Sequence, residues 1–103
     1  MSVVVTAVMH PAPGRTDDVL AGIADAIGGV HAEAGCELYA AHRADDGMIV
    51  LVEKWATEAD FAAHSTGAAR DALRARLDGL MAAPTEVSVI VAVPLGDPAK
   101  GAL

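Results

Sequence analysis

The chain has 103 residues, of which 53% are hydrophobic but only 3% aromatic, and its formal net charge at pH 7 is −7. This length predicts one small domain, whose core must be built from Val, Ala, Leu and Ile, and the negative charge argues against a nucleic-acid-binding protein. A single cysteine cannot form an internal disulfide, and the apolar N-terminal run is too short to span a bilayer. We therefore expect a cytoplasmic protein that does not associate with membranes.

The first part of the chain predicts a strand, a helix and a second strand. Residues 2–9 are apolar on both alternating faces, and the proline-containing segment 10–14 ends this strand. Thr16, followed by two aspartates, is expected to cap a helix that reaches about residue 31. Residues 36–43 then alternate as the second strand.

The stretch 48–64 organises the rest of the chain. Residues 48–55 form a strand that pairs with the second strand through the tight turn 44–47, and Glu53 and Trp55 share one of its faces. Thr57 opens a helix through an approximate capping box, and Phe61 and His64 lie on one side of that helix. This strand and helix together are where we expect the chemistry.

Two further elements complete the predicted domain. Residues 65–67 either interrupt the helix or begin a new one, and the helical pattern then continues until Pro84 ends it. A Val-rich strand over 86–93 follows. The domain is expected to span 1–94, with 95–103 as a flexible tail.

This order of elements predicts the fold class. Strand, helix, strand, strand, helix, strand is typical of an α+β, ferredoxin-like βαββαβ protein, with an antiparallel sheet and the helices on one face. The first, third and last strands are apolar on both faces, so the face without helices also needs cover. A second copy of the chain would cover it, and we expect a homodimer.

Three short motifs resemble a known family. They are GC-x-x-Y-x-x-H-R over 35–43, E-x-W over 53–55 and F-x-x-H over 61–64. With their spacing, the chain from Val3 to about Val93 resembles the antibiotic biosynthesis monooxygenase (ABM) domains of the dimeric α+β barrel superfamily. The resemblance implies a homodimer with a pocket between sheet and helices in each subunit. Some members oxidise anthrones or quinols without metal, flavin or haem, others degrade haem, and others act on small signalling sugars or have no known activity.

The haem-degrading branch differs from this chain at the residues that define it. That branch carries an asparagine on the first strand and a tryptophan and a histidine on the second helix, and those positions align with Ala7, His64 and Arg74 here. No set of His, Cys, Asp or Glu has metal-ligand spacing either. We therefore expect neither haem nor another cofactor, and no metal.

His64 is the predicted catalytic residue. Histidine changes protonation near neutral pH, so it can act as a general base. The alternative is a structural histidine that hydrogen-bonds a loop or the partner subunit. Glu53 needs a partner if it is buried, and Arg43 on the adjacent strand is the expected counter-ion. An ion pair at the strand end is favoured there over a catalytic acid.

The aromatic residues are the other predicted contacts of a substrate. Tyr39, Trp55 and Phe61 can stack on a flat ligand, and Tyr39 can also form a hydrogen bond through its hydroxyl. Packing against the helix explains Trp55 equally well, and Phe61 also anchors the helix to the sheet. With Arg43 and Glu53, these residues form the predicted substrate-binding set.

The leading functional hypothesis is a cofactor-independent monooxygenase that oxidises a small aromatic, quinol- or anthrone-like substrate with O₂. In this hypothesis His64 is the base, Tyr39 or Arg43 is the donor to the developing oxyanion, and the aliphatic sheet keeps the pocket dry. The alternatives are a non-catalytic dimeric domain that binds a small hydrophobic ligand, and an isomerase or lyase that uses the same base.

Overall fold

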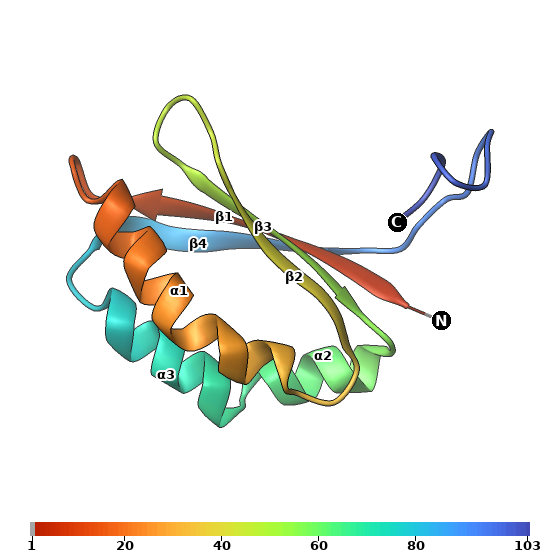
Figure 1. The fold of residues 1–103 in the computed structure, drawn as a ribbon, viewed down its shortest axis with the longest axis horizontal. Helices are drawn as coiled ribbons and strands as arrows, with labels where there is room; N and C mark the ends of the chain where they lie inside the picture. Colours follow the sequence, from red (N-terminus) through yellow and green to blue (C-terminus); the bar gives the residue numbers. More distant parts are fainter. Residues whose placement is uncertain (1) are drawn as a thin grey trace.

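A four-stranded antiparallel sheet with helices on one face forms the body of the molecule (Figure 1). The computed structural model describes residues 2–103. The sheet has the strand order β2-β3-β1-β4, which confirms the predicted α+β, ferredoxin-like fold. The elements in chain order are β1 (Val3–Pro11), α1 (Thr16–His31), β2 (Cys36–Arg43), β3 (Ile49–Trp55), α2 (Glu58–Ser65), α3 (Ala68–Leu77) and β4 (Met81–Ile90).

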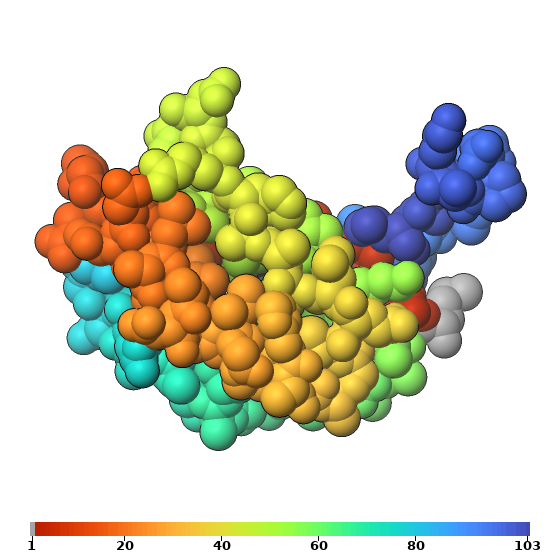
Figure 2. All heavy atoms as spheres, viewed as in Figure 1, coloured from red at the N-terminus to blue at the C-terminus, as the bar shows by residue number. Residues whose placement is uncertain are grey.

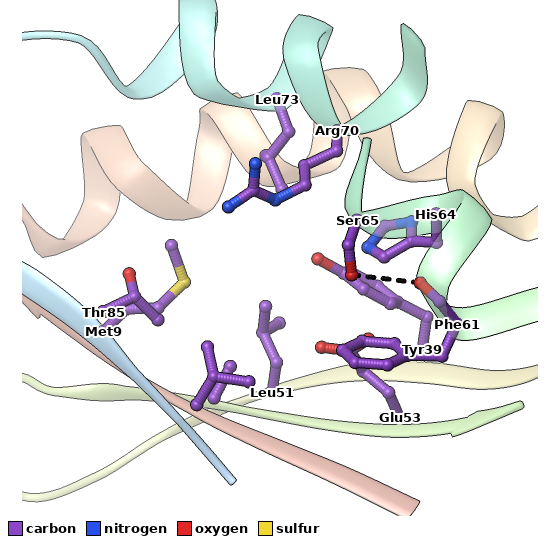
Figure 3. Close-up of a pocket in the computed structure, with 12 residues that line it drawn as sticks. Met9, Tyr39, Leu51, Glu53, Phe61, His64, Ser65, Arg70, Leu73 and Thr85 are labelled. Carbon is purple, nitrogen blue, oxygen red and sulfur yellow. Dashed lines mark hydrogen bonds between the residues drawn. The ribbon is translucent and has the colours of Figure 1, made fainter. Parts of the chain in front are cut away.

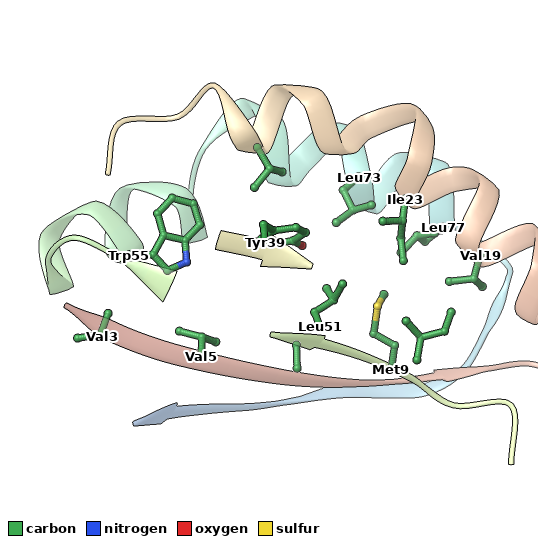
Figure 4. Close-up of a cluster of buried hydrophobic side chains, with 13 residues drawn as sticks. Val3, Val5, Met9, Val19, Ile23, Tyr39, Leu51, Trp55, Leu73 and Leu77 are labelled. Carbon is green, nitrogen blue, oxygen red and sulfur yellow. The ribbon is translucent and has the colours of Figure 1, made fainter. Parts of the chain in front are cut away.

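The core lies between the two central strands and the helices (Figure 4). In the register of β1 and β3, Val3 opposes Trp55, Ala7 opposes Leu51 and Met9 opposes Ile49, and all of these side chains are buried. Because side chains alternate along a strand, this register brings one apolar set from each strand to the helical face. The helices close the core with Val19, Ile23 and Val30 of α1 and Leu73 and Leu77 of α3.

The helical run after Thr57 consists of two helices. Thr57 caps α2 as predicted, since its Oγ1 accepts a hydrogen bond of 3.1 Å from the Asp60 N–H. The helix ends at Ser65, and Gly67 is the N-cap of α3. Of the two alternatives for residues 65–67, the start of a new helix is therefore the one that the structure adopts.

The prediction that Pro84 ends the last helix is wrong. The helix α3 ends at Leu77, and Pro84 lies inside β4. A proline is tolerated there because β4 is an edge strand, and the pairing register of β1 and β4 shifts between Val8 and His10, opposite this part of β4. The last strand therefore starts earlier than expected, at Met81.

The predicted cap of α1 is also wrong. Thr16 is the first residue of the helix, its N-cap is Arg15, and no side chain caps this end. The Thr16 hydroxyl instead donates a hydrogen bond of 2.8 Å to the carbonyl oxygen of Gly47 in the β2–β3 turn. This bond connects the start of α1 to the hairpin.

The helices leave the β4 side of the sheet uncovered. Val87 and Val89 pair with Ala7 and Val5 of β1, yet both are more than half exposed. After β4 the chain leaves the body of the molecule, with Val93 and Leu95 exposed (Figures 1 and 2). Within residues 2–103, no helix is long and apolar enough to cross a membrane. The homodimer that the apolar faces predict is not tested by one chain and stays a prediction.

Candidate active site

A cavity of about 240 Å³ lies between the inner face of the sheet and helices α2 and α3 (Figure 3). Its apolar wall comes from both the sheet and the helices, and its polar groups gather mainly near α2. The uncovered strand β4 contributes two exposed residues, so the cavity opens on that side. It is lined by Ala7, Met9, Tyr39, Leu51, Glu53, Phe61, His64, Ser65, Arg70, Leu73, Thr85 and Val87.

His64 lies in the wall of this cavity and is only 6% exposed. Its Nδ1 donates a hydrogen bond of 2.6 Å to Oε1 of Glu33. Its ring stacks on Trp55, with ring centroids 4.6 Å apart and planes inclined by 29°, and Tyr39 meets it edge-on. These contacts fix both the position and the orientation of the imidazole.

The other ring nitrogen of His64 faces the cavity. Nε2 forms no hydrogen bond with any residue in the range 2–103. Within that range, every side-chain nitrogen or oxygen atom that is fully buried has a hydrogen-bond partner. Nε2 must therefore be accessible, and the cavity is the space beside it. When Nδ1–H is directed at a carboxylate, Nε2 carries the free lone pair, which is the arrangement that a general base needs.

Glu33 is a site residue that the sequence did not reveal. It lies in the loop after α1, and 31 positions separate it from His64. Only the fold brings the two together, since the loop between α1 and β2 passes beside α2. No motif joins this glutamate to the histidine, so its role could be found only from the structure.

Tyr39 and Glu53 face each other across β2 and β3 on the sheet side of the cavity. Both side chains are buried, at 5% and 4% exposure. Burial, reinforced by the negative charge of Glu53, raises the pKa of Tyr39 well above its ordinary value. The phenol of Tyr39 therefore stays protonated, and it can donate a hydrogen bond into the cavity.

Glu53 is not paired with Arg43, so the predicted ion pair is wrong. Oε1 of Glu53 accepts a hydrogen bond of 3.0 Å from Nε1 of Trp55. Burial raises the pKa of the Glu53 carboxyl, and the Trp55 hydrogen bond and the nearby His64 oppose that shift. Arg43 lies opposite Ile49 at the other end of β3, where it is exposed and pairs with Asp17. The structure does not bring Arg43 to the cavity.

Besides Tyr39, the two other predicted aromatic contacts of a ligand, Trp55 and Phe61, have different positions. Trp55 is fully buried and lies behind His64, so it supports the imidazole and does not line the cavity. Phe61 does line the cavity, with its ring centroid 6.4 Å from that of Trp55. Of the six predicted site residues, Tyr39, Glu53, Phe61 and His64 meet at the cavity, whereas Trp55 is behind it and Arg43 is remote.

Arg70 and Ser65 are two further polar residues of the cavity. Ser65 is the last residue of α2, and its hydroxyl donates a hydrogen bond of 3.0 Å to the Phe61 carbonyl oxygen. Arg70 is on the first turn of α3 and is half-buried. In the sequence it was indistinguishable from the exposed Arg74, because only the packing of α3 decides which arginine faces inward.

The remaining titratable groups in the described part of the chain form neither a metal site nor a reactive thiol. Across residues 2–103, no three His, Cys, Asp or Glu side chains gather in a way that could hold a metal ion. Cys36 is half-buried, and burial together with the charges of Glu33 and Glu53 raises the pKa of its thiol. The raised pKa disfavours the reactive thiolate at this position.

Solved structures of similar proteins share this fold. Rv0793 from Mycobacterium tuberculosis is 26% identical over 94% of this chain and 98% of its own, with a TM-score of 0.79. A Bordetella bronchiseptica protein that carries the name of the antibiotic biosynthesis monooxygenases is 25% identical over 89% of this chain and 97% of its own, with a TM-score of 0.80. A Caulobacter crescentus protein of the same name shares the fold at 21% identity, with a TM-score of 0.81 and coverage of 89% and 90%.

The family assignment comes from the sequence match. No curated protein matches the chain. The family model described as antibiotic biosynthesis monooxygenase matches residues 2–76, which include β1 to α2 and most of α3, and with them His64, Glu33, Tyr39 and Glu53. The chain therefore belongs to the antibiotic biosynthesis monooxygenase family.

Proposed function

We propose that this protein is a cofactor-independent monooxygenase that oxidises a small phenolic aromatic compound with O₂. The observation that carries the proposal is the buried His64, which is hydrogen-bonded at 2.6 Å to the part-buried Glu33, with its second imidazole nitrogen facing a largely apolar cavity. Membership of the antibiotic biosynthesis monooxygenase family supports the reaction class.

The first step of the proposed reaction is removal of the phenolic proton. Nε2 of His64 accepts that proton, and the carboxylate of Glu33 stabilises the imidazolium that forms. The resulting phenolate is electron-rich enough to react with O₂ directly. A correctly placed base of this kind accelerates such a step by about 10²–10⁴-fold.

Tyr39 is the proposed donor to the phenolate oxygen. Its ring centroid lies 5.8 Å from that of His64, and its raised pKa keeps the hydroxyl proton in place. Of the two donors that the sequence suggested, Arg43 is too remote to act here. The apolar side chains Ala7, Leu51 and Leu73 exclude water, which strengthens hydrogen bonds to the developing charge.

The proposed reaction needs no external reductant. One oxygen atom of O₂ becomes bonded to a ring carbon, as a carbonyl oxygen in an anthrone and as a hydroxyl oxygen in a quinol. The other oxygen leaves as water with the two hydrogens that the substrate loses. The substrate supplies all four electrons that reduce O₂. A quinol becomes a hydroxyquinone in this way, and an anthrone becomes an anthraquinone.

The size of the cavity favours the smaller of these substrates. At about 240 Å³ it is below the range of roughly 300–1,000 Å³ typical of sites for drug-sized ligands. A quinol with one or two rings therefore fits better than a three-ring anthrone.

Oxygen uptake tests the proposal. The purified protein, with chelator present, is given a panel of dihydroxynaphthalenes and anthrones while O₂ and product are followed. We expect O₂ and substrate to be consumed in a ratio of one to one, with no build-up of peroxide. Substrate conversion without O₂ uptake would indicate an isomerase or lyase instead, and saturable binding without conversion would indicate a ligand-binding domain.

A further inference from the structure

Arg70 is a cation in the cavity without a carboxylate partner. Within residues 2–103, Arg15, Arg43 and Arg76 each pair with an aspartate, whereas Arg70 and Arg74 form no ion pair. Arg74 is exposed and can be hydrated by bulk water. Arg70 is half-buried and lines the cavity, so water does not surround it in the same way.

The carboxylates nearest the cavity are engaged elsewhere. Glu33 is bonded to Nδ1 of His64 at 2.6 Å, and Glu53 accepts the Trp55 N–H on the sheet side of the cavity. Figure 3 shows Arg70 on the helix side of the cavity, across from Glu53. Among residues 2–103, no acidic side chain therefore forms an ion pair with Arg70.

The chemistry of arginine restricts what can neutralise it. The guanidinium group stays protonated in proteins, and its fork of N–H donors matches the two oxygens of a carboxylate. A partly buried charge without a counter-ion is unfavourable, so a ligand that brings one gains affinity. The chain carries a net charge of −7, which repels anions at long range, so any preference for an anion must come from this local contact.

We propose that Arg70 binds a carboxylate group of the ligand, and that the substrate is a small hydroxyaryl carboxylic acid. Its phenol faces His64 and its carboxylate faces the guanidinium of Arg70. The position of the phenol rests on the proposed function, whereas binding of the carboxylate does not require turnover.

Calorimetric titration with two probes that differ only in the carboxylate tests this proposal. The probes are 6-hydroxy-2-naphthoate and 2-naphthol, and the proteins are the unmodified chain, Arg70→Gln and Arg74→Gln. We expect the unmodified chain to bind the carboxylate probe about tenfold or more tightly than 2-naphthol. Arg70→Gln should remove that preference, and Arg74→Gln, one helical turn further on, should retain it.

A third probe and a second variant make the test decisive. Arg70→Lys keeps the charge but loses the fork of donors, so it should keep only part of the preference, and it replaces Arg70→Gln if that variant does not fold. Any of three results would overturn the proposal: equal affinity of the unmodified chain for both probes, an unchanged preference for the carboxylate probe in Arg70→Gln, or no saturable binding of either probe. Tighter binding of 2-naphthyl phosphate would also overturn it, because the site would then select phosphate esters. Binding with the expected preference but without O₂ uptake would leave the Arg70 site intact and reject the monooxygenase alone.

Discussion

At the scale of single residues, the site depends on how firmly His64 is held. Glu33 binds its Nδ1, Trp55 stacks on one face of the ring, and Tyr39 contacts it edge-on. Each neighbour restricts a different motion of the imidazole. Trp55 is itself fixed by its hydrogen bond to Glu53, so the buried acid supports the histidine indirectly.

The carboxylate of Glu33 has a testable role in that arrangement. In Glu33→Gln the amide N–H₂ can donate to Nδ1, which would leave the proton on Nε2, where the proposed base needs a lone pair. We expect turnover to fall by about 10²–10⁴-fold with little change in KM. Glu37→Gln is the matched control, because Glu37 is exposed and bonds only Ser2. Equal turnover in the two variants would show that Glu33 does not position the base.

Glu53 should make stability depend on pH. Burial raises the pKa of its carboxyl above the ordinary value of 4.5. Between pH 4.5 and the raised pKa of the folded state, the carboxyl is therefore protonated in the folded protein and ionised in the unfolded chain. The contribution of the protonated acid is therefore present at low pH and is lost as the pH rises through the raised pKa of the folded state.

Glu53→Gln should remove this dependence. The amide oxygen can still accept the Trp55 N–H, but the side chain no longer titrates. Urea unfolding from about pH 4 to pH 8 should show the variant gaining stability relative to the unmodified chain as the pH rises. A difference in free energy of unfolding that stays constant over this range would contradict the assignment.

At the scale of elements, the position of α2 decides where His64 lies. Thr57 caps the start of the helix, and Gly35, in the turn before β2, packs against Asp60 on its first turn. Gly35 has a φ of +77°, and a Cβ there would lie 2.1 Å from Asp60 Oδ2 and 2.6 Å from Asp60 Cβ. This contact requires glycine at the first position of the motif that extends to Arg43.

Substitution of two glycines separates backbone strain from this contact. Gly14 also has a φ of +77°, but no atom lies within 4 Å of the place a Cβ would take. Both alanine variants should lose about 1–2 kcal/mol from the left-handed backbone, and Gly35→Ala should lose about 1–3 kcal/mol more. Urea unfolding measures both, and equal losses would mean that the turn and α2 are not in tight contact.

The elements also show which parts of the structure could be predicted from the sequence. The strands β1 to β3 and helix α1 were predictable because alternation and helical spacing are local patterns, and the hairpin turn lies next to them in the chain. The prediction that Pro84 ends the last helix was wrong because an edge strand tolerates a proline, and the whole sheet decides which strand lies at the edge. The prediction that Thr16 caps α1 was wrong because its hydroxyl donates a hydrogen bond to Gly47, in a turn 31 positions later in the chain.

The site was only partly predictable for the same reason. His64, Tyr39 and Glu53 belong to short motifs on elements with a readable pattern. Glu33 and Arg70 reach the cavity through the packing of a loop and a helix, which no local pattern encodes. Arg43 lies on the strand that pairs with the strand of Glu53, yet the register places it opposite Ile49, at the other end of β3.

At the scale of the whole molecule, the uncovered β4 side is the main unexplained surface. Val87, Val89 and Ile90 are exposed on β4, and Val91, Val93 and Leu95 are exposed on the segment after it. So much apolar surface favours association. We expect a homodimer, and light scattering at micromolar concentration should give twice the 10.4 kDa mass of one chain. A monomer with native secondary structure would contradict this expectation.

A charge on the strand face opposite the helices should weaken the dimer. Val50 is half-buried on β3 and opposes Val8 of β1. A lysine there would be buried against the partner without a counter-ion, which costs several kcal/mol. Val50→Lys should therefore dissociate or aggregate, whereas Ala72→Lys on the exposed side of α3 should remain dimeric. A soluble Val50→Lys dimer would place the interface elsewhere.

The proposed role of His64 as the base of an O₂-dependent oxidation can be tested with the His64→Ala variant. Turnover and urea unfolding are measured on the same preparation of His64→Ala. We expect turnover to fall by about 10²–10⁴-fold, by far more than the change in stability explains. A purely structural histidine would instead lower the free energy of unfolding by about 1–3 kcal/mol, with activity falling only in step. Unchanged turnover in a well-folded His64→Ala protein would show that His64 is not the base.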